Sequence, residues 1–167
     1  MNNSTSDKAI ARGLVGGFMA TIAMDLVCAG FFASMGMPAD LTYSFIGNVA
    51  GSLFSRIGMD LSGSRPLGAV VHFLLGIALG GLLGLAVSRI KALQADSLGK
   101  NLLLGIAYTE IVSQPIVATA PLLGNMTSSE ILHWYALSTG MHLIYGTILG
   151  GILSCRQRAV TSTDYAA

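Results

Sequence analysis

Four carboxyl or imidazole side chains lie deep inside the long apolar stretches of this 167-residue sequence, one in each stretch. They are two carboxylic acids and two imidazoles: Asp25, His72, Glu110 and His142. An ionisable side chain at the centre of a bilayer costs at least ~2.5 kcal/mol, so each one needs a partner or a function. Carboxyl and imidazole groups can exchange protons, form ion pairs or bind metal ions. The sequence therefore predicts a buried polar centre built from these four residues.

Other polar residues in the same stretches are predicted to support this centre. Pro115 has no backbone N–H, so it leaves the carbonyl of Ile111 without its helical donor, next to Glu110. Such a break is tolerated in a membrane helix where neighbouring polar groups satisfy the backbone. The predicted supporting residues are Thr21, Ser113, Gln114, Pro115 and Tyr145.

Three functions are compatible with such a centre. The first is proton- or ion-linked transport. The second is a b-type haem held by His72 and His142 as axial ligands, with Gly76 and Gly146 leaving room for the ring, or a transition metal on the same histidines. The third is an accessory subunit of a larger membrane complex, in which carboxyl–imidazole pairs only hold helices together. Catalysis is not expected, because no nucleophile–base pair, zinc motif or phosphate-binding loop is recognisable.

The composition indicates where these residues reside. Hydrophobic residues make up 53% of the chain and charged residues 10%, and the mean hydropathy is +0.68. A soluble domain carries about 25% charged residues, so a soluble enzyme and a disordered chain are excluded. With 9 basic and 8 acidic residues, no net charge attracts a nucleic acid. The lipid bilayer is the expected partner.

The apolar stretches are long enough to cross a membrane, which takes about 20 residues. The predicted spans are 13–35, 66–88, 101–123 and 131–153. They predict an all-α, integral membrane four-helix bundle over 13–154, with an N-terminal arm at 1–12 and a C-terminal tail at 155–167. Between the first two spans, apolar residues recur at helical spacing over about 40–57. This segment is predicted to be a short amphipathic helix in the outer interface of the membrane.

The distribution of Lys and Arg predicts the orientation, because basic loops stay in the cytoplasm. Seven lie in the arm, the loop after the second span or the tail, and two lie in the loop after the first span. Both termini are therefore expected in the cytoplasm.

The second and fourth spans share a pattern. The twelve residues from His72 and the twelve from His142 are identical at six positions. The first and third spans match more faintly, as Gly17-x-x-x-Thr21 and Gly105-x-x-x-Thr109. These matches predict two duplicated helical hairpins, as in transporters with parallel repeats. Small residues four apart allow helices to approach closely in lipid. The glycines predicted to pack helices are Gly76, Gly80, Gly84, Gly146 and Gly150.

Short motifs in all four spans carry a resemblance. They are Ala20-Thr21-Ile22-Ala23-Met24-Asp25, His72-x-x-x-Gly76-Ile77, Gln114-Pro115 and His142-x-x-Tyr145-Gly146. In these motifs the chain resembles small, uncharacterised four-span proteins of the bacterial inner membrane, which are grouped in domain-of-unknown-function families. The resemblance implies a four-helix membrane fold in the bacterial cytoplasmic membrane, and it implies no particular activity. A homo-oligomer or a larger membrane complex remains open as the protein's assembly.

Overall fold

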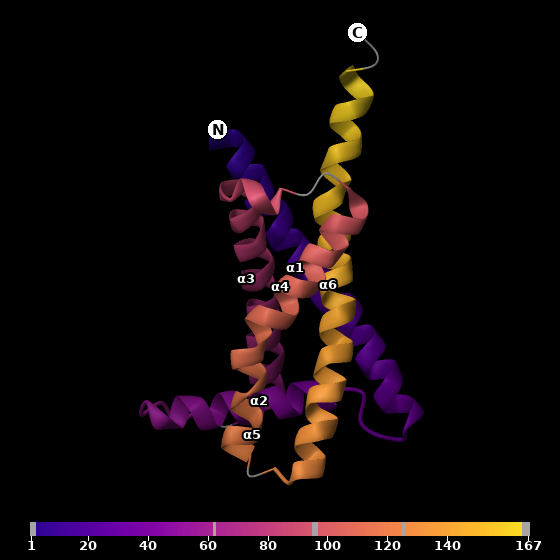
Figure 1. Ribbon diagram of the computed structural model, residues 1–167. Coiled ribbons are helices and arrows are strands. Elements are labelled where there is room, and N and C mark those ends of the chain that lie inside the picture. Colours follow the sequence, from indigo (N-terminus) through magenta and orange to yellow (C-terminus); the bar gives the residue numbers. More distant parts are fainter. Residues whose placement is uncertain (1–2, 62, 95–96, 125, 165–167) are drawn as a thin grey trace.

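The described structure is all-helical. A computed structural model describes residues 3–61, 63–94, 97–124 and 126–164, and no strand occurs within these ranges. In chain order the helices are α1 (Asn3–Ser34), α2 (Leu41–Arg56), α3 (Arg65–Arg89), the short 3-10 helix η1 (Lys91–Leu93), α4 (Leu98–Val117), α5 (Thr119–Gly124) and α6 (Ser128–Asp164). Figure 1 shows α1, α3, α4 and α6 running along one another, with both termini at the same end.

Four helical segments are long and apolar enough to cross a membrane, and they correspond to the predicted spans. They cover Ser6–Ser34, Arg65–Arg89, Leu98–Leu123 and Ser128–Ser154. The first and last helices extend beyond the predicted spans. The arm predicted at 1–12 is helical from Asn3, and the tail predicted at 155–167 is helical as far as Asp164. The ends of both segments, 1–2 and 165–167, lie outside the described residues.

The third span is divided by two prolines. Pro115 lies inside α4, and the helix ends at Val117 before α5 begins at Thr119. Pro121 lies four residues after Val117 and has no N–H to donate to the Val117 carbonyl. The indole Nε1 of Trp134, on α6, donates to that carbonyl instead, at 2.9 Å. The break is therefore stabilised by a neighbouring helix.

The long helices form two closely packed pairs. α1 packs mainly against α3, and α4 mainly against α6, while α1 and α6 join the two pairs. In the first pair, a Cβ on Gly17 would collide with the carbonyl oxygen of Gly76. In the second pair, a Cβ on Gly105 would collide with the carbonyl oxygen of Gly146. Both pairs thus bring backbone against backbone, which only glycine permits at these positions.

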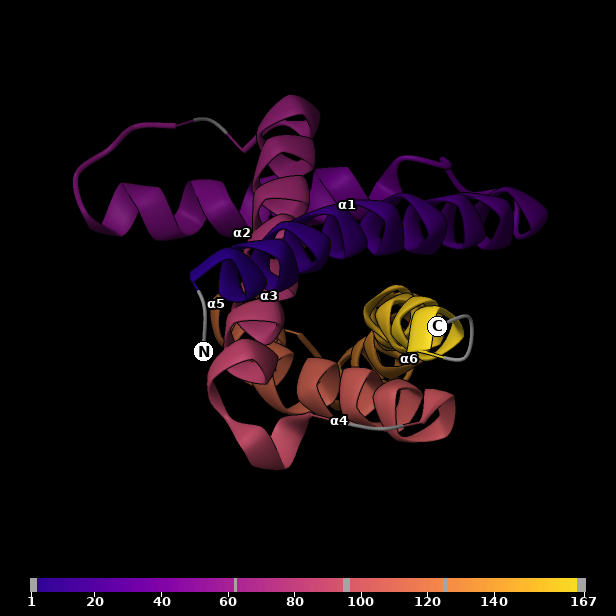
Figure 2. The ribbon, with the colours of Figure 1, turned by 90° about the horizontal axis from the view of Figure 1, so that it is seen from above.

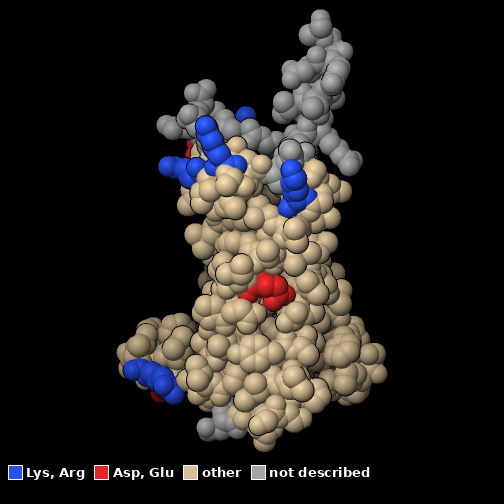
Figure 3. Space-filling view, viewed as in Figure 1, with Lys and Arg blue, Asp and Glu red and all other residues tan. Residues whose placement is uncertain are grey.

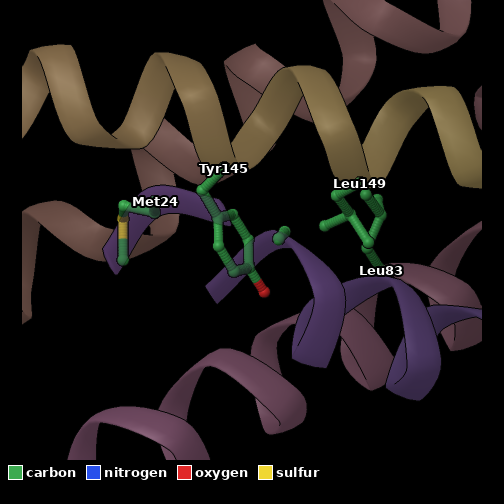
Figure 4. Packing of buried hydrophobic residues seen from close by; sticks show 5 residues of the cluster. Met24, Leu83, Tyr145 and Leu149 are labelled. Atoms are coloured by element: carbon green, nitrogen blue, oxygen red, sulfur yellow. The ribbon is translucent and has the colours of Figure 1, made fainter. Parts of the chain in front are cut away.

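The apolar core lies where the two pairs meet. Its buried cluster consists of Ala20, Met24, Leu83, Tyr145 and Leu149. Figure 4 shows Tyr145 and Leu149 pointing from α6 toward this cluster. Leu83 and Leu149 are fully buried, so α1, α3 and α6 share one packed centre.

α2 crosses the end of the bundle opposite the termini (Figures 1 and 2). Its bounds, Leu41–Arg56, agree with the amphipathic helix predicted at about 40–57. The residues of α2 that are buried are the small ones, Gly47, Ala50 and Gly51. Leu53 is 50% exposed, whereas the ring of Phe45 packs against Trp134 of α6, with 4.4 Å between the ring centroids.

Candidate functional site

Asp25 and His72 form a closely bonded pair between α1 and α3. The Nε2 atom of His72 lies 2.9 Å from Oδ1 of Asp25, and the two side chains are 14% and 13% exposed. Tyr43 of α2 donates its hydroxyl to the other carboxylate oxygen, Oδ2, at 2.7 Å. Both oxygens of Asp25 therefore have a hydrogen-bonding partner, and each partner comes from a different helix.

Tyr43 is a site residue that the sequence analysis missed. It lies one helical turn before Gly47 and two turns before Gly51, so the three residues share one face of α2. The two glycines let this face approach the start of α3, and this brings the Tyr43 hydroxyl to Asp25. Burial and the hydrogen bond to Asp25 raise the pKa of Tyr43 to about 12, so its hydroxyl stays protonated at neutral pH. The spacing Tyr43-x-x-x-Gly47-x-x-x-Gly51 is the signal that could have identified it.

Glu110 and His142 form a second, looser pair between α4 and α6. His142 Nδ1 shares a hydrogen bond with the Ser113 hydroxyl at 2.9 Å and lies 3.8 Å from Oε2 of Glu110. Gln114 donates to the same Oε2 atom at 3.4 Å. The other carboxylate oxygen, Oε1, is buried and has no hydrogen-bonding partner within the described part of the chain. A buried acceptor without a donor costs about 1–3 kcal/mol of stability, so the second pair lacks one hydrogen bond that the first pair has.

The four predicted ionisable residues thus form two neighbouring pairs. His72 lies one turn before Gly76 and His142 one turn before Tyr145, and the Tyr145 hydroxyl donates to the Gly76 carbonyl, so the two pairs lie at a similar level of the bundle. No hydrogen bond joins the two imidazoles in the described structure. Asp25 bonds to His72 on α3 and to Tyr43 on α2, and Glu110 contacts His142 on α6 and Gln114 on its own helix.

Two more of the predicted supporting residues, Thr21 and Tyr145, contact Gly76 on α3. Thr21 bonds to its own helix, at the Gly17 carbonyl (2.9 Å), and its hydroxyl packs against Gly76. The Tyr145 hydroxyl donates to the Gly76 carbonyl, which links α6 to α3. Tyr108, which the sequence analysis did not select, makes a similar link from α4 to the Leu79 carbonyl at 2.9 Å. Ser113 and Gln114 lie at the second pair, and Pro115 follows them directly in α4.

An open cleft of about 290 Å³ leads to the first pair. It lies between α1 and α2, and its lining includes Asp25, Tyr43, Phe73 and, on the loop that precedes α2, Asp40. Asp40 also forms an ion pair of 2.8 Å with Arg65 at the start of α3. The cleft therefore connects Asp25 with the end of the bundle opposite the termini.

The residues do not fit the predicted haem or metal site. The Thr21 side chain fills the space beside Gly76, and the backbone of Gly105 and Ile106 fills the space beside Gly146. The room expected for a haem ring is thus occupied by the neighbouring helix. Among the described residues, no three His, Cys, Asp or Glu side chains come together as a metal site would require. His72 and His142 instead bond to Asp25 and Ser113.

The glycines predicted to pack helices lie at the contacts between the paired helices. A Cβ on Gly80 would collide with the carbonyl of Gly13, one on Gly84 with that of Ala9, and one on Gly150 with that of Asn101. All five predicted glycines, Gly76, Gly80, Gly84, Gly146 and Gly150, are buried against the partner helix of their pair.

Comparisons with known proteins give no relative. No family model matches the chain, and no match is found among the curated proteins or the solved structures. The function is therefore argued from the geometry of the two carboxyl–imidazole pairs.

Proposed function

We propose that this protein moves protons, or an ion or solute coupled to protons, through the two carboxyl–imidazole pairs of a multi-pass membrane bundle. The observation that carries the proposal is the position of Asp25. It lines an open cleft, and its two carboxylate oxygens bond to His72 and Tyr43. A carboxyl group that is reached from outside and bonded to an imidazole is suited to be the first acceptor for an incoming proton.

The first pair can pass a proton and return to its starting state. A proton on the Asp25 carboxyl transfers to Nε2 of His72 across the 2.9 Å hydrogen bond. The resulting imidazolium releases its other proton from Nδ1, which leaves the ring with a proton on Nε2. Transfer of that proton from Nε2 to Nδ1 through water restores the tautomer that can accept from Asp25 again. Asp25 is left as a carboxylate, ready for the next proton from the cleft. Tyr43, whose pKa is raised to about 12, remains a hydrogen-bond donor and holds Oδ2 in place throughout.

The second pair provides the next groups along the path. His142 Nδ1 is bonded to Ser113 at 2.9 Å and lies 3.8 Å from Oε2 of Glu110. No hydrogen bond joins the two rings in the described structure, so the step between His72 and His142 would run through one or more water molecules. The unpartnered Oε1 of Glu110 is where a proton or a water molecule would complete the second pair.

The proposed location is the bacterial cytoplasmic membrane, with both termini in the cytoplasm. Its support is the distribution of charge. Figure 3 shows Lys and Arg side chains gathered at the end where the termini lie, with a smaller group at the opposite end. The basic residues at that opposite end are Arg56, the last residue of α2, and Arg65, the first residue of α3. The positive-inside rule then places α2 and the cleft on the outer side. We also propose that the chain is related to the small four-span inner-membrane proteins that its motifs resemble.

An origin by duplication of a helix pair is also part of the proposal. What supports it is the correspondence of contacts in the two pairs. Thr21 bonds to the Gly17 carbonyl four residues before it, and Thr109 bonds to the Gly105 carbonyl in the same way. One turn further along, Asp25 and Ser113 occupy corresponding positions, and each bonds to the histidine of its own pair.

Proton flux into liposomes containing the purified protein tests the proposed function. An imposed membrane potential drives the flux, and a pH-sensitive dye inside the vesicles reports it. Asp25→Asn is expected to lower the protein-dependent flux at least tenfold, because the amide cannot take up the proton. Asp40→Asn is the matched control, because Asp40 lines the same cleft at its outer edge, and it is expected to keep most of the flux. Wild-type flux equal to that of empty liposomes, or full flux in Asp25→Asn, would contradict the proposal.

A purely structural role, as in an accessory subunit, is the competing function. This structural role is favoured by the observation that the hydrogen bonds of Asp25 connect α1 with α2 and α3. The two functions predict different results for Asp25→Asn. A structural role predicts that the variant unfolds more easily and that even the stable wild type shows no protein-dependent flux.

A further inference from the structure

The outward face of α4 carries strongly polar side chains at about mid-height. Exposed residues there follow one stripe: Leu103, Ala107, Ile111 and Gln114. Glu110 borders this stripe, and its side chain is 24% exposed. Figure 3 shows an acidic patch in the middle of the face over α4, and Glu110 is the only acidic residue of that helix.

The other long helices show no comparable feature along their middle portions in the described structure. The large exposed residues of α1 there are apolar, such as Phe18 and Leu26, and those of α3 are apolar too, such as Leu74 and Leu82. On α6 the exposed polar residues of the middle portion are threonines, Thr139 and Thr147. An exposed primary amide and a partly exposed glutamate are much more costly in hydrocarbon than a threonine hydroxyl, so we expect another protein surface to cover this face of α4.

Glu110 and Gln114 can form hydrogen bonds with the same two residues of a second copy of the protein. The Gln114 amide makes one long bond, of 3.4 Å, to Glu110 Oε2 within its own chain. An amide has two N–H donors and a carbonyl acceptor, and a carboxyl group has acceptors, with one donor when protonated. Around a twofold axis, the carboxyl and the amide of one copy can therefore face the amide and the carboxyl of the other. Ala107, one turn away, is small enough to let the two backbones approach.

We infer that this protein is a homodimer in the membrane, with the α4 stripe of Leu103, Ala107, Ile111 and Gln114 as its interface. Glu110 and Gln114 of each copy form the polar centre of this interface. The inference goes beyond the proposed function, because the same contact would form whether or not protons move through the pairs.

Cross-linking from single cysteines tests the interface directly. The background carries Cys28→Ser and Cys155→Ser, so that only the introduced thiol reacts. Ile111→Cys places a thiol on the stripe, and Leu74→Cys places one on the apolar outward face of α3. The two positions are matched, since Ile111 is 72% and Leu74 is 61% exposed. A short bismaleimide added to membranes is expected to yield a product of twice 17.3 kDa from Ile111→Cys and not from Leu74→Cys.

A measurement of association strength provides the second test. Gln114→Leu removes the amide but keeps an apolar stripe, and it is expected to weaken dimerisation in lipid roughly threefold to tenfold, as polar contacts between membrane helices do. Thr139→Leu, on the outward face of α6, is the control and should leave dimerisation unchanged. Monomeric wild-type protein in lipid would overturn the inference, and so would equal cross-linking from both cysteines. A product at Ile111→Cys whose mass fits only a different protein would overturn it as well. Neither measurement depends on proton flux.

Discussion

Replacing Gly80 by alanine tests whether the helices are paired as described. A Cβ at this position would collide with the carbonyl oxygen of Gly13 and with the Cα and N atoms of Gly17. All three contacts are backbone atoms, so no side chain can move aside, and α1 must separate from α3. Overpacking of this kind costs about 1–3 kcal/mol. Gly140 is the matched control, because it also lies inside a long helix but has no neighbouring atom within 4 Å of the place that a Cβ would take.

The comparison of the two variants isolates the collision. Both substitutions replace glycine by alanine within a helix, so both gain about 1 kcal/mol of helix propensity. The difference between Gly80→Ala and Gly140→Ala is therefore expected to be about 1–3 kcal/mol in the free energy of unfolding. Titration with a denaturing detergent, followed by circular dichroism, measures this difference. Equal stability of the two variants would refute the close packing of α1 on α3.

Two further predictions follow from single hydrogen bonds. The pKa of Tyr43 is raised from 10.0 to about 12, so the folded protein holds this proton more tightly than the unfolded chain. Tyr43 therefore stabilises the fold below pH 10, and this contribution is lost as the pH rises from 10 to 12. Across this range the free energy of unfolding should fall less steeply with pH for Tyr43→Phe than for the wild type. Trp134→Phe should lower the free energy of unfolding by about 1–3 kcal/mol, because the Val117 carbonyl loses its only donor in the described structure. Unchanged thermal unfolding of Trp134→Phe would contradict the account of the α4–α5 break.

The number of long helices and the position of their apolar segments could be predicted from the sequence, because both depend on local hydropathy. The spacing of the glycines also predicted close helix packing. Which helix pairs with which depends on contacts between residues far apart in the chain, and hydropathy carries no such information. Gly17 and Gly76, for example, meet through the register of α1 on α3, which no local pattern determines.

The candidate site was predictable in its residue types and less so in its connections. Asp25, His72, Glu110 and His142 stand out because ionisable residues are rare in apolar segments. The assignment of Asp25 to His72, and of Glu110 to His142, follows from the register of each helix pair. Tyr43 was missed because it lies outside the predicted spans, and its bond to Asp25 joins residues 18 positions apart in the chain. The haem prediction was made because a glycine indicates that something packs closely against the helix, but not whether it is a cofactor or another helix. In the structure, the neighbours of Gly76 and Gly146 are helices.

Proton flux in the variants Asp25→Asn, Glu110→Gln and their combination tests the central claim most directly. If the two pairs are consecutive parts of one path, each single variant should already abolish the protein-dependent flux. The double variant should then be no worse than either single one, as is found for groups that act as a unit. Full flux in Glu110→Gln, or losses that simply multiply in the double variant, would contradict a single path through both pairs.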